Sequence, residues 1–167
     1  MTCLVKNLGE LLEIEPIMKV ILEEMQVRGI KSVLDVGCGP CRITKYFEGF
    51  DYTGIDKIDY ATNGKEFPWA KFVWGKPVQE YVPEQPFDAV WTHCFFCLAT
   101  IGDNEMRVII EWLRKWTRWI FLCDTPRLDG VEWQKILAEA GFELEAHGVV
   151  KDATPVVEVW RNTEARK

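Results

Sequence analysis

Five short apolar runs, each bounded by glycine, proline or charged residues, constrain the fold of this chain more than any other feature. They occupy residues 32–36, 51–55, 71–74, 87–92 and 118–123. Short runs between such boundaries are typical of parallel strands that are buried on both faces. They predict a parallel sheet that is covered by helices on both sides.

Segments with apolar residues at helical spacing lie between or before these runs. We expect helices at residues 7–28, 41–48, 103–117 and 129–140. Strands that alternate with helices predict an α/β fold with a Rossmann-like, doubly wound, mostly parallel sheet. Sheets of this kind bind their ligands at the carboxyl ends of the strands.

The end of the chain has a different pattern. Residues 142–150 and 155–161 alternate between apolar and polar side chains, which predicts a C-terminal antiparallel strand pair and a seven-stranded sheet. A length of 167 residues is usual for one domain. We expect a single domain, 1–167, with an N-terminal helical cap at 1–30, a ligand-binding core at 31–161 and a tail at 162–167.

The charge of the chain limits its partners. A net charge of −6 and a pI near 5.1 argue against nonspecific binding to nucleic acid, which needs a basic surface. A local basic patch would still permit it. The candidate patch consists of Arg107, Arg114, Lys115 and Arg118. The alternative is that these residues form the solvated face of a helix.

The N-terminus and the cysteines indicate the compartment. Lys6, Glu10 and Glu13 interrupt the apolar core that a secretion signal would need. The longest apolar run, 95–101, is too short to span a membrane. Six cysteines without such a signal indicate reduced thiols, so we expect a cytoplasmic protein that does not associate with membranes.

The first strand runs into a glycine loop with the sequence DVGCGPC. An ordinary dinucleotide loop has a third glycine three residues after the second, but that position is Arg42. Asp35 lies two residues before Gly37, and a carboxylate there would repel a pyrophosphate. It suits a ligand with an ammonium group, which would lie near Asp35 beside the backbone of Gly37 and Gly39.

The motif resembles the first motif of the class I S-adenosylmethionine-dependent methyltransferases, D/E-x-G-x-G-x-G, with Cys41 in place of the third glycine. The strand YTGID ends in Asp56, and the segment FDAVWTHCFF at 87–96 fits the family's fourth strand, in the order that the family has. The resemblance runs from about residue 30 to residue 161. It implies that S-adenosyl-L-methionine is the cofactor.

The resemblance also assigns positions around this cofactor. It implies that Asp56 holds the ribose hydroxyls, and that Lys57 and Ile58 flank the adenine. Lys76 and Pro77 follow Gly75, where the family has an acid that contacts the adenine. Lys76 replaces that acid, so the contact would have to come from the backbone or from elsewhere. The amino-acid end would be held by the loop residues Asp35, Gly37, Cys38 and Gly39.

Methyl transfer needs the acceptor atom beside the methyl carbon, and a base only if the acceptor arrives protonated. The resemblance places Thr92 and His93 beside the methyl group, and Thr92 also among the cofactor contacts. His93 is the candidate base, with a structural role as the alternative. Asp124 would orient a substrate or cap a turn. The expected acceptor is a small molecule or an exposed side group; the methylated atom and the oligomeric state stay open.

Two C-x-x-C pairs, Cys38 with Cys41 and Cys94 with Cys97, could meet at the same sheet edge and hold zinc. Buried cysteines more often pack as small apolar side chains, so we expect no metal. Cys41 and Lys76 favour a different class of function, a non-catalytic binding or scaffold protein with the same fold. Aminopropyl transfer and nicotinamide-dependent dehydrogenation fit the motifs less well.

Overall fold

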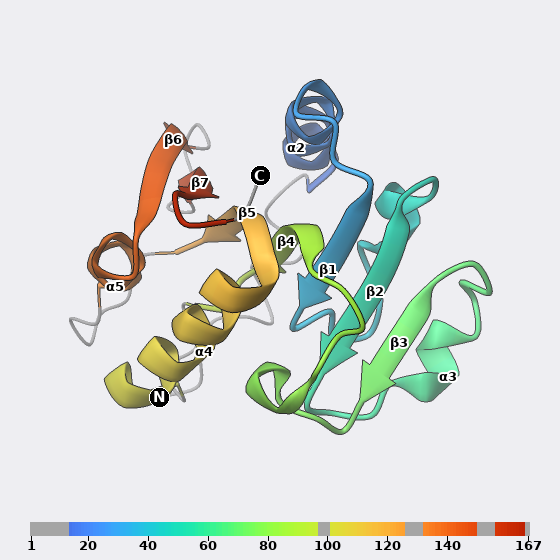
Figure 1. Cartoon of the computed structure of the whole chain (residues 1–167). Helices are drawn as coiled ribbons and strands as arrows, with labels where there is room; N and C mark the ends of the chain where they lie inside the picture. Colours follow the sequence, from blue (N-terminus) through green and yellow to red (C-terminus); the bar gives the residue numbers. More distant parts are fainter. Residues whose placement is uncertain (1–13, 97–100, 126–131, 150–155, 166–167) are drawn as a thin grey trace.

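The computed structural model describes residues 14–96, 101–125, 132–149 and 156–165. In this part of the chain the strands form one seven-stranded sheet with the order β3-β2-β1-β4-β5-β7-β6 (Figure 1). The strands are β1 (Ser32–Val36), β2 (Asp51–Asp56), β3 (Lys71–Trp74), β4 (Phe87–His93), β5 (Thr117–Asp124), β6 (Phe142–Val149) and β7 (Val156–Asn162). The first five are parallel, and β7 pairs antiparallel with both β5 and β6. The predicted α/β fold with its C-terminal antiparallel pair is confirmed.

Helices cover both faces of the sheet. They are α2 (Ile14–Val27), η1 (Thr44–Phe47), α3 (Ala61–Gly64), η2 (Val78–Glu80), α4 (Asp103–Trp116) and α5 (Trp133–Glu139). One apolar cluster joins α2 and η1 to the sheet, and the other joins α4 and α5 to its opposite face. Figure 1 shows α4 and α5 together on one side and α2 apart from them.

The central strands supply side chains to both clusters in turn. We call these the α2 cluster and the α4 cluster. In β1, Val33 belongs to the α2 cluster and Leu34 to the α4 cluster. In β4, Trp91 belongs to the α2 cluster and Val90 to the α4 cluster. All four side chains are buried. Double burial explains why these strands have continuous apolar runs rather than an alternating pattern.

The helix predicted at 41–48 is wrong. Only a short 3₁₀ helix, η1, forms there, after Cys41 with a φ of 62°. A residue in the left-handed region cannot continue a right-handed α-helix, and Gly49, with a φ of 98°, ends the segment on its other side. The connection from β1 to β2 is therefore a loop that contains one short 3₁₀ helix and no α-helix.

The other predicted helices agree with the structure where it describes them. The N-terminal helix is present from Ile14, and Pro16 lies in its first turn, where proline is tolerated. The predicted residues 7–13 and 129–131 lie outside the described residues.

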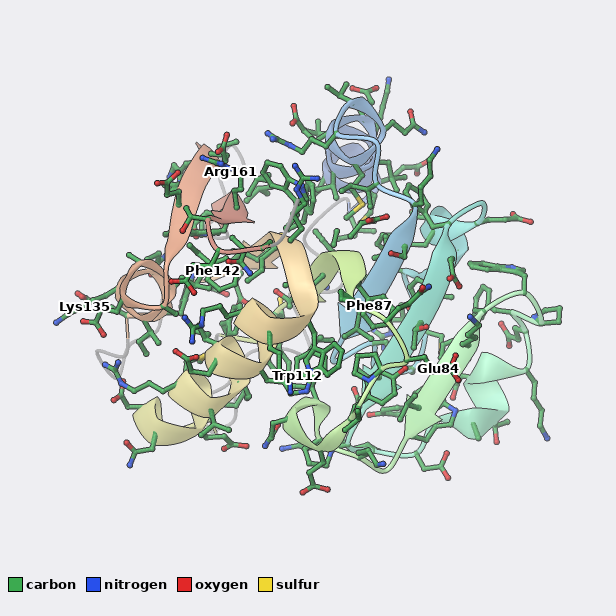
Figure 2. The ribbon with its side chains drawn as sticks, viewed as in Figure 1. Glu84, Phe87, Trp112, Lys135, Phe142 and Arg161 are labelled. Carbon is green, nitrogen blue, oxygen red and sulfur yellow. The ribbon has the colours of Figure 1, made fainter. Side chains whose placement is uncertain are left out.

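Trp112 lies between α4 and the η2 segment, and its indole nitrogen donates to the carbonyl oxygen of Tyr81 at 2.9 Å (Figure 2).

In the described ranges, no helix has the length and apolar character that crossing a membrane requires.

Candidate functional site

The glycine loop after β1 is tied to the end of β2. The amides of Gly37 and Cys38 donate to the carbonyl oxygen of Ile55 at 2.9 and 3.2 Å. Gly37 and Gly39 have φ angles of 75° and 53°, which glycine adopts without strain. A Cβ atom on Gly37 would lie 2.7 Å from a ring carbon of Phe95, so this position also lacks room for a side chain.

Asp56 completes this connection. Its carboxylate accepts hydrogen bonds from the amides of Gly39 at 2.9 Å and of Ile58 at 2.8 Å. The side chain is partly buried and lines a cleft. The acid at the end of the second strand thus holds the loop in place and offers carboxylate oxygens to a ligand in the cleft.

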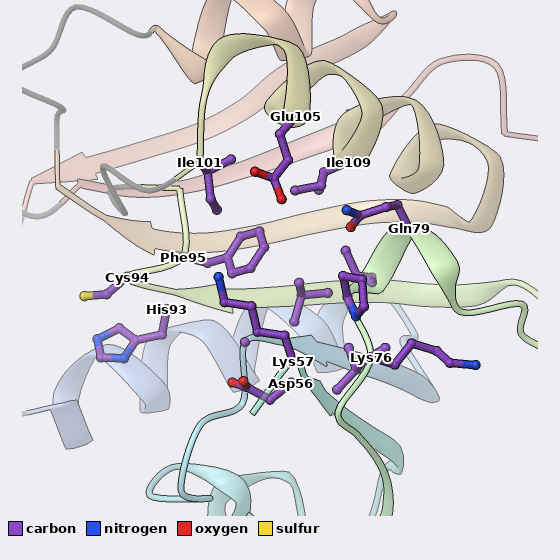
Figure 3. A pocket seen from close by; sticks show the side chains of 15 residues that line it. Asp56, Lys57, Lys76, Gln79, His93, Cys94, Phe95, Ile101, Glu105 and Ile109 are labelled. Atoms are coloured by element: carbon purple, nitrogen blue, oxygen red, sulfur yellow. The ribbon is translucent and has the colours of Figure 1, made fainter. Parts of the chain in front are cut away.

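The cleft lies at the carboxyl edge of the sheet, where β1, β2 and β4 end (Figure 3). Its walls combine apolar side chains with a few polar ones. The predicted site residues among its lining are Gly37, Asp56, Lys57, Lys76, Pro77 and His93. The remaining predicted residues, which lie outside this lining, are Asp35, Cys38, Gly39, Ile58 and Thr92.

Several lining residues were not predicted from the sequence. They are Val78 and Gln79 from η2, Ile101 before α4, and Glu105 and Ile109 from α4. Glu105 and Ile109 are four residues apart, which puts them on one face of α4. This spacing was available in the sequence, but which face would meet the cleft was not.

Asp35 lies beneath the loop rather than in the cleft. Its side chain is 1% exposed, and it accepts a hydrogen bond from the hydroxyl of Tyr52 at 2.7 Å. The Tyr52 hydroxyl is also 3.1 Å from the hydroxyl of Thr44. Burial raises the pKa of Asp35 to about 7, although the Tyr52 hydrogen bond acts in the opposite direction.

His93 lies at the end of β4 and lines the cleft. Burial lowers its pKa, while the nearby carboxylates of Asp124 and Asp35 oppose that shift. The imidazole is therefore neutral at pH 7. Its Nε2 atom is buried without a hydrogen-bond partner in the described part of the chain. A neutral imidazole nitrogen at the edge of a cleft can accept a proton or a hydrogen bond from a ligand.

Thr92 lies within the sheet. Its side chain is fully buried, and its hydroxyl has no hydrogen-bond partner among the described residues. The structure thus separates Thr92 from the cleft that His93 lines.

Asp124 holds the segment that follows β4. Its carboxylate accepts hydrogen bonds from the amides of Phe95 at 3.1 Å and Phe96 at 2.8 Å. Cys94 precedes them with a φ of 52°, and its amide donates to the carbonyl oxygen of Cys123. These bonds support the capping role for Asp124, and they position the Phe95 ring above Gly37.

The cysteines of the loop have the properties of packing residues. Cys38 and Cys41 are buried free thiols. Burial raises the pKa of both, for Cys41 to about 11, so the thiolates that zinc requires are disfavoured. Cys97 lies outside the described residues. Within the described ranges, no group of three or more His, Cys, Asp or Glu side chains could hold a metal ion.

Two residues of the candidate basic patch, Arg107 and Arg114, form ion pairs with nearby acids. Arg107 pairs with Asp103 and Glu139, at 3.2 and 2.7 Å. Arg114 pairs with Glu111 and with Glu164, at 3.0 and 2.7 Å. These ion pairs favour a solvated helix face over a nucleic-acid surface.

Solved structures of other proteins share this architecture. A methyltransferase from Clostridium acetobutylicum that depends on S-adenosylmethionine has a TM-score of 0.76, at 7% identity over 93% of this chain and 94% of that chain. The 1,6-didemethyltoxoflavin N1-methyltransferase of Burkholderia thailandensis has a TM-score of 0.71, at 19% identity over 95% of this chain and 82% of that chain. The chain has the class I methyltransferase fold.

A comparison of sequences finds a weaker similarity, to one methyltransferase. The chain is 27% identical over 122 residues to a fatty-acid O-methyltransferase of Mycolicibacterium smegmatis, a match that covers 68% of this chain. It spans only 44% of that protein's length. No family model matches the sequence. The fold implied by the glycine loop, Asp56 and the fourth strand is thus confirmed.

Proposed function

We propose that the cleft binds S-adenosylmethionine and that the chain transfers its methyl group to a small molecule or an exposed side group. The observation that carries this proposal is the position of Asp56. Its carboxylate joins the glycine loop to the end of β2 and faces a cleft in a methyltransferase fold. The Burkholderia methyltransferase with the same fold was solved with bound S-adenosylhomocysteine and 1,6-didemethyltoxoflavin, which supports a small-molecule acceptor.

The residues of the cleft fit such a molecule. Two oxygens of the Asp56 carboxylate can accept hydrogen bonds from the two ribose hydroxyls while they retain those from Gly39 and Ile58, because each oxygen has two acceptor sites. Apolar side chains from Ile55, Val78 and Ile109 can enclose a heterocycle. The Phe95 ring, packed against Gly37, adds an aromatic wall to the same cleft. When bound, S-adenosylmethionine supplies an electrophilic methyl group and a neutral thioether leaving group.

The remaining steps belong to the protein. The cleft holds the acceptor atom in line with the methyl carbon, which converts a bimolecular reaction into an effectively unimolecular one. His93, neutral at pH 7, takes the proton of an acceptor that arrives as a hydroxyl or protonated amine. Asp35 remains beneath the loop, where its electrostatic influence reaches the ammonium group through the loop or through water.

The test is the affinity for S-adenosylhomocysteine of an Asp56→Ala variant. We expect affinity to fall roughly ten- to a hundredfold, which corresponds to a total loss of about 1.5–3 kcal/mol, the usual contribution of hydrogen bonding to a charged group. Asp88→Ala is the matched control. Asp88 also accepts two backbone amide hydrogen bonds, from Lys31 and Ser32, but at the opposite edge of the sheet.

Calorimetric titration of both variants separates ligand binding from loop stability. The proposal requires Asp56→Ala to lose affinity while Asp88→Ala retains it. Equal affinities in the two variants, with both folded by circular dichroism, would overturn the assignment of Asp56.

A further inference from the structure

The polar side chains around the cleft differ in whether they can accept a hydrogen bond from an adenine ring. The exocyclic amino group of adenine donates hydrogen bonds and needs an acceptor. Lys57 and Lys76 carry only donors. Lys76 is exposed and directed away from the cleft (Figure 3). The acceptor that the third strand would supply is therefore missing at this position.

Glu105 supplies an acceptor from another element. It lies in the first turn of α4, and its carboxylate points from the helix into the cleft, toward the side where Lys57 and Phe95 lie (Figure 3). Glu105 faces the ends of β2 and β4 across the cleft. A ligand that fills the space between α4 and these strands would meet its carboxylate.

The other acids of α4 have different surroundings. Asp103 pairs with Arg107, and Glu111 pairs with Arg114. Within the described ranges, no side chain forms an ion pair or hydrogen bond with the Glu105 carboxylate. Glu105 is exposed, so water can hydrate its carboxylate, and it is the one acid of these three that lines the cleft.

The side chains beside Glu105 define a slot for a flat ring. Ile109 lies on the same side of α4 as Glu105, Ile101 lies just before the helix, and Pro77 and Val78 also line this part of the cleft. An aromatic ring with an apolar face and a polar edge suits this arrangement, because the apolar walls cover the face and the carboxylate meets the edge. Asp56, already bonded to two amides, lies at the other end of the slot.

We propose that the Glu105 carboxylate accepts a hydrogen bond from the exocyclic amino group of adenine. It would take the role of the acid that the family has at the position of Lys76. This inference rests on the proposed function, since it assumes that S-adenosylmethionine occupies the cleft. It makes Glu105 a specificity-determining residue for the cofactor rather than a residue that acts on the transferred methyl group.

The test compares two ligands that differ at one edge of the purine ring. S-Adenosylhomocysteine has the amino group and an unprotonated N1, whereas S-inosylhomocysteine has a carbonyl oxygen and an N1–H group. The unmodified chain should prefer the adenosyl ligand. In Glu105→Gln this preference should fall roughly three- to tenfold, as expected for one net hydrogen bond, because the glutamine amide can also donate to the carbonyl.

Asp103→Asn is the matched control, because it removes the same charge from the same turn of α4 at a residue that pairs with Arg107 outside the cleft. Its ligand preference should not change. An unchanged preference in Glu105→Gln, or an equal loss of affinity for both ligands, would overturn the role of Glu105. If neither ligand binds the folded unmodified chain, the proposed function itself fails, and this inference fails with it.

Discussion

Asp35 is an ionisable residue in a position where burial disfavours its charged form. Its carboxyl group lies beneath the glycine loop with the Tyr52 hydroxyl as its hydrogen-bond donor, and Thr44 extends this chain of polar groups. All three side chains are at most 1% exposed. An ionised carboxylate in such a place is costly, which is why its pKa is raised to about 7.

This shift predicts how stability depends on pH. Between about pH 4 and pH 7 the folded chain keeps a proton on Asp35 that the unfolded chain, with a pKa near 3.8, releases. The contribution of Asp35 to the free energy of unfolding is therefore largest at low pH and is lost as the pH rises toward 7, by at most about 4 kcal/mol. Above pH 7 both states are ionised, and the dependence ends.

Denaturant titrations from pH 4 to pH 8 would measure this dependence. The Asp35→Asn variant cannot ionise at this position but can still accept the Tyr52 hydrogen bond, so it should lack this part of the pH dependence. Identical pH profiles for the variant and the unmodified chain would show that Asp35 is not protonated in the folded state.

The glycine loop pointed to Asp35 in the sequence and the family resemblance to Asp56, but neither indicated the difference in their exposure. That difference depends on strand register. Asp35 pairs with Gly54, whereas Tyr52 pairs with Val33, so the Tyr52 ring extends along the sheet face to reach the Asp35 carboxyl group. A register between two strands separated by a loop is a property of the folded sheet, and no local pattern encodes it.

At the scale of single elements, α4 connects the core to the cleft. One side of the helix is buried through Met106, Ile109, Ile110 and Leu113. Glu105 and Ile109 extend this side to the cleft, so the position of the helix on the sheet also sets the width of the site. The stability of α4 packing and the geometry of the cleft are therefore linked.

Two substitutions in α4 should differ sharply in their effects. Ile110 is fully buried in the α4 cluster, and Ile110→Ala should lower the free energy of unfolding by about 2–5 kcal/mol through lost burial and a residual cavity. Val108 is 54% exposed on the opposite side, and Val108→Ala should change it by less than about 0.5 kcal/mol. Chemical denaturation of both variants would check this, and comparable losses would contradict the observed orientation of the helix.

The elements were predictable to different degrees. The buried strands were located within a residue or two, because burial on both faces leaves a continuous apolar run. The helix at 41–48 was wrong, because its apolar spacing said nothing of the left-handed backbone at Cys41. Glu105 was missed for a related reason: helical spacing identifies a face, but only the packed sheet determines what that face meets.

At the scale of the whole molecule, strand order brings the functional side chains together. β1 lies between β2 and β4, so the glycine loop, Asp56 and His93 all reach the carboxyl edge of three adjacent strands. The alternation of strands and helices predicted this edge, and the resemblance of the motifs predicted the order of its residues. The acceptor side of the cleft was not predictable in this way, because its walls come from long connections without a recurring pattern.

Charge at this scale supports the same interpretation. The chain has a net charge of −6, and the arginines of α4 that were candidates for a nucleic-acid surface are held in ion pairs. The two lysines Lys57 and Lys76 belong to the lining of the cleft. These charges fit the proposed compact ligand better than an extended anionic polymer.

The most direct test of the central claim is calorimetric titration of the folded, unmodified chain with S-adenosylmethionine and S-adenosylhomocysteine, with NAD as the control. We expect one ligand of each of the first two to bind per chain with a micromolar dissociation constant, and no heat of binding with NAD. A folded chain that binds neither S-adenosylmethionine nor S-adenosylhomocysteine would contradict the account, and would favour a scaffold protein that keeps the methyltransferase fold without its cofactor.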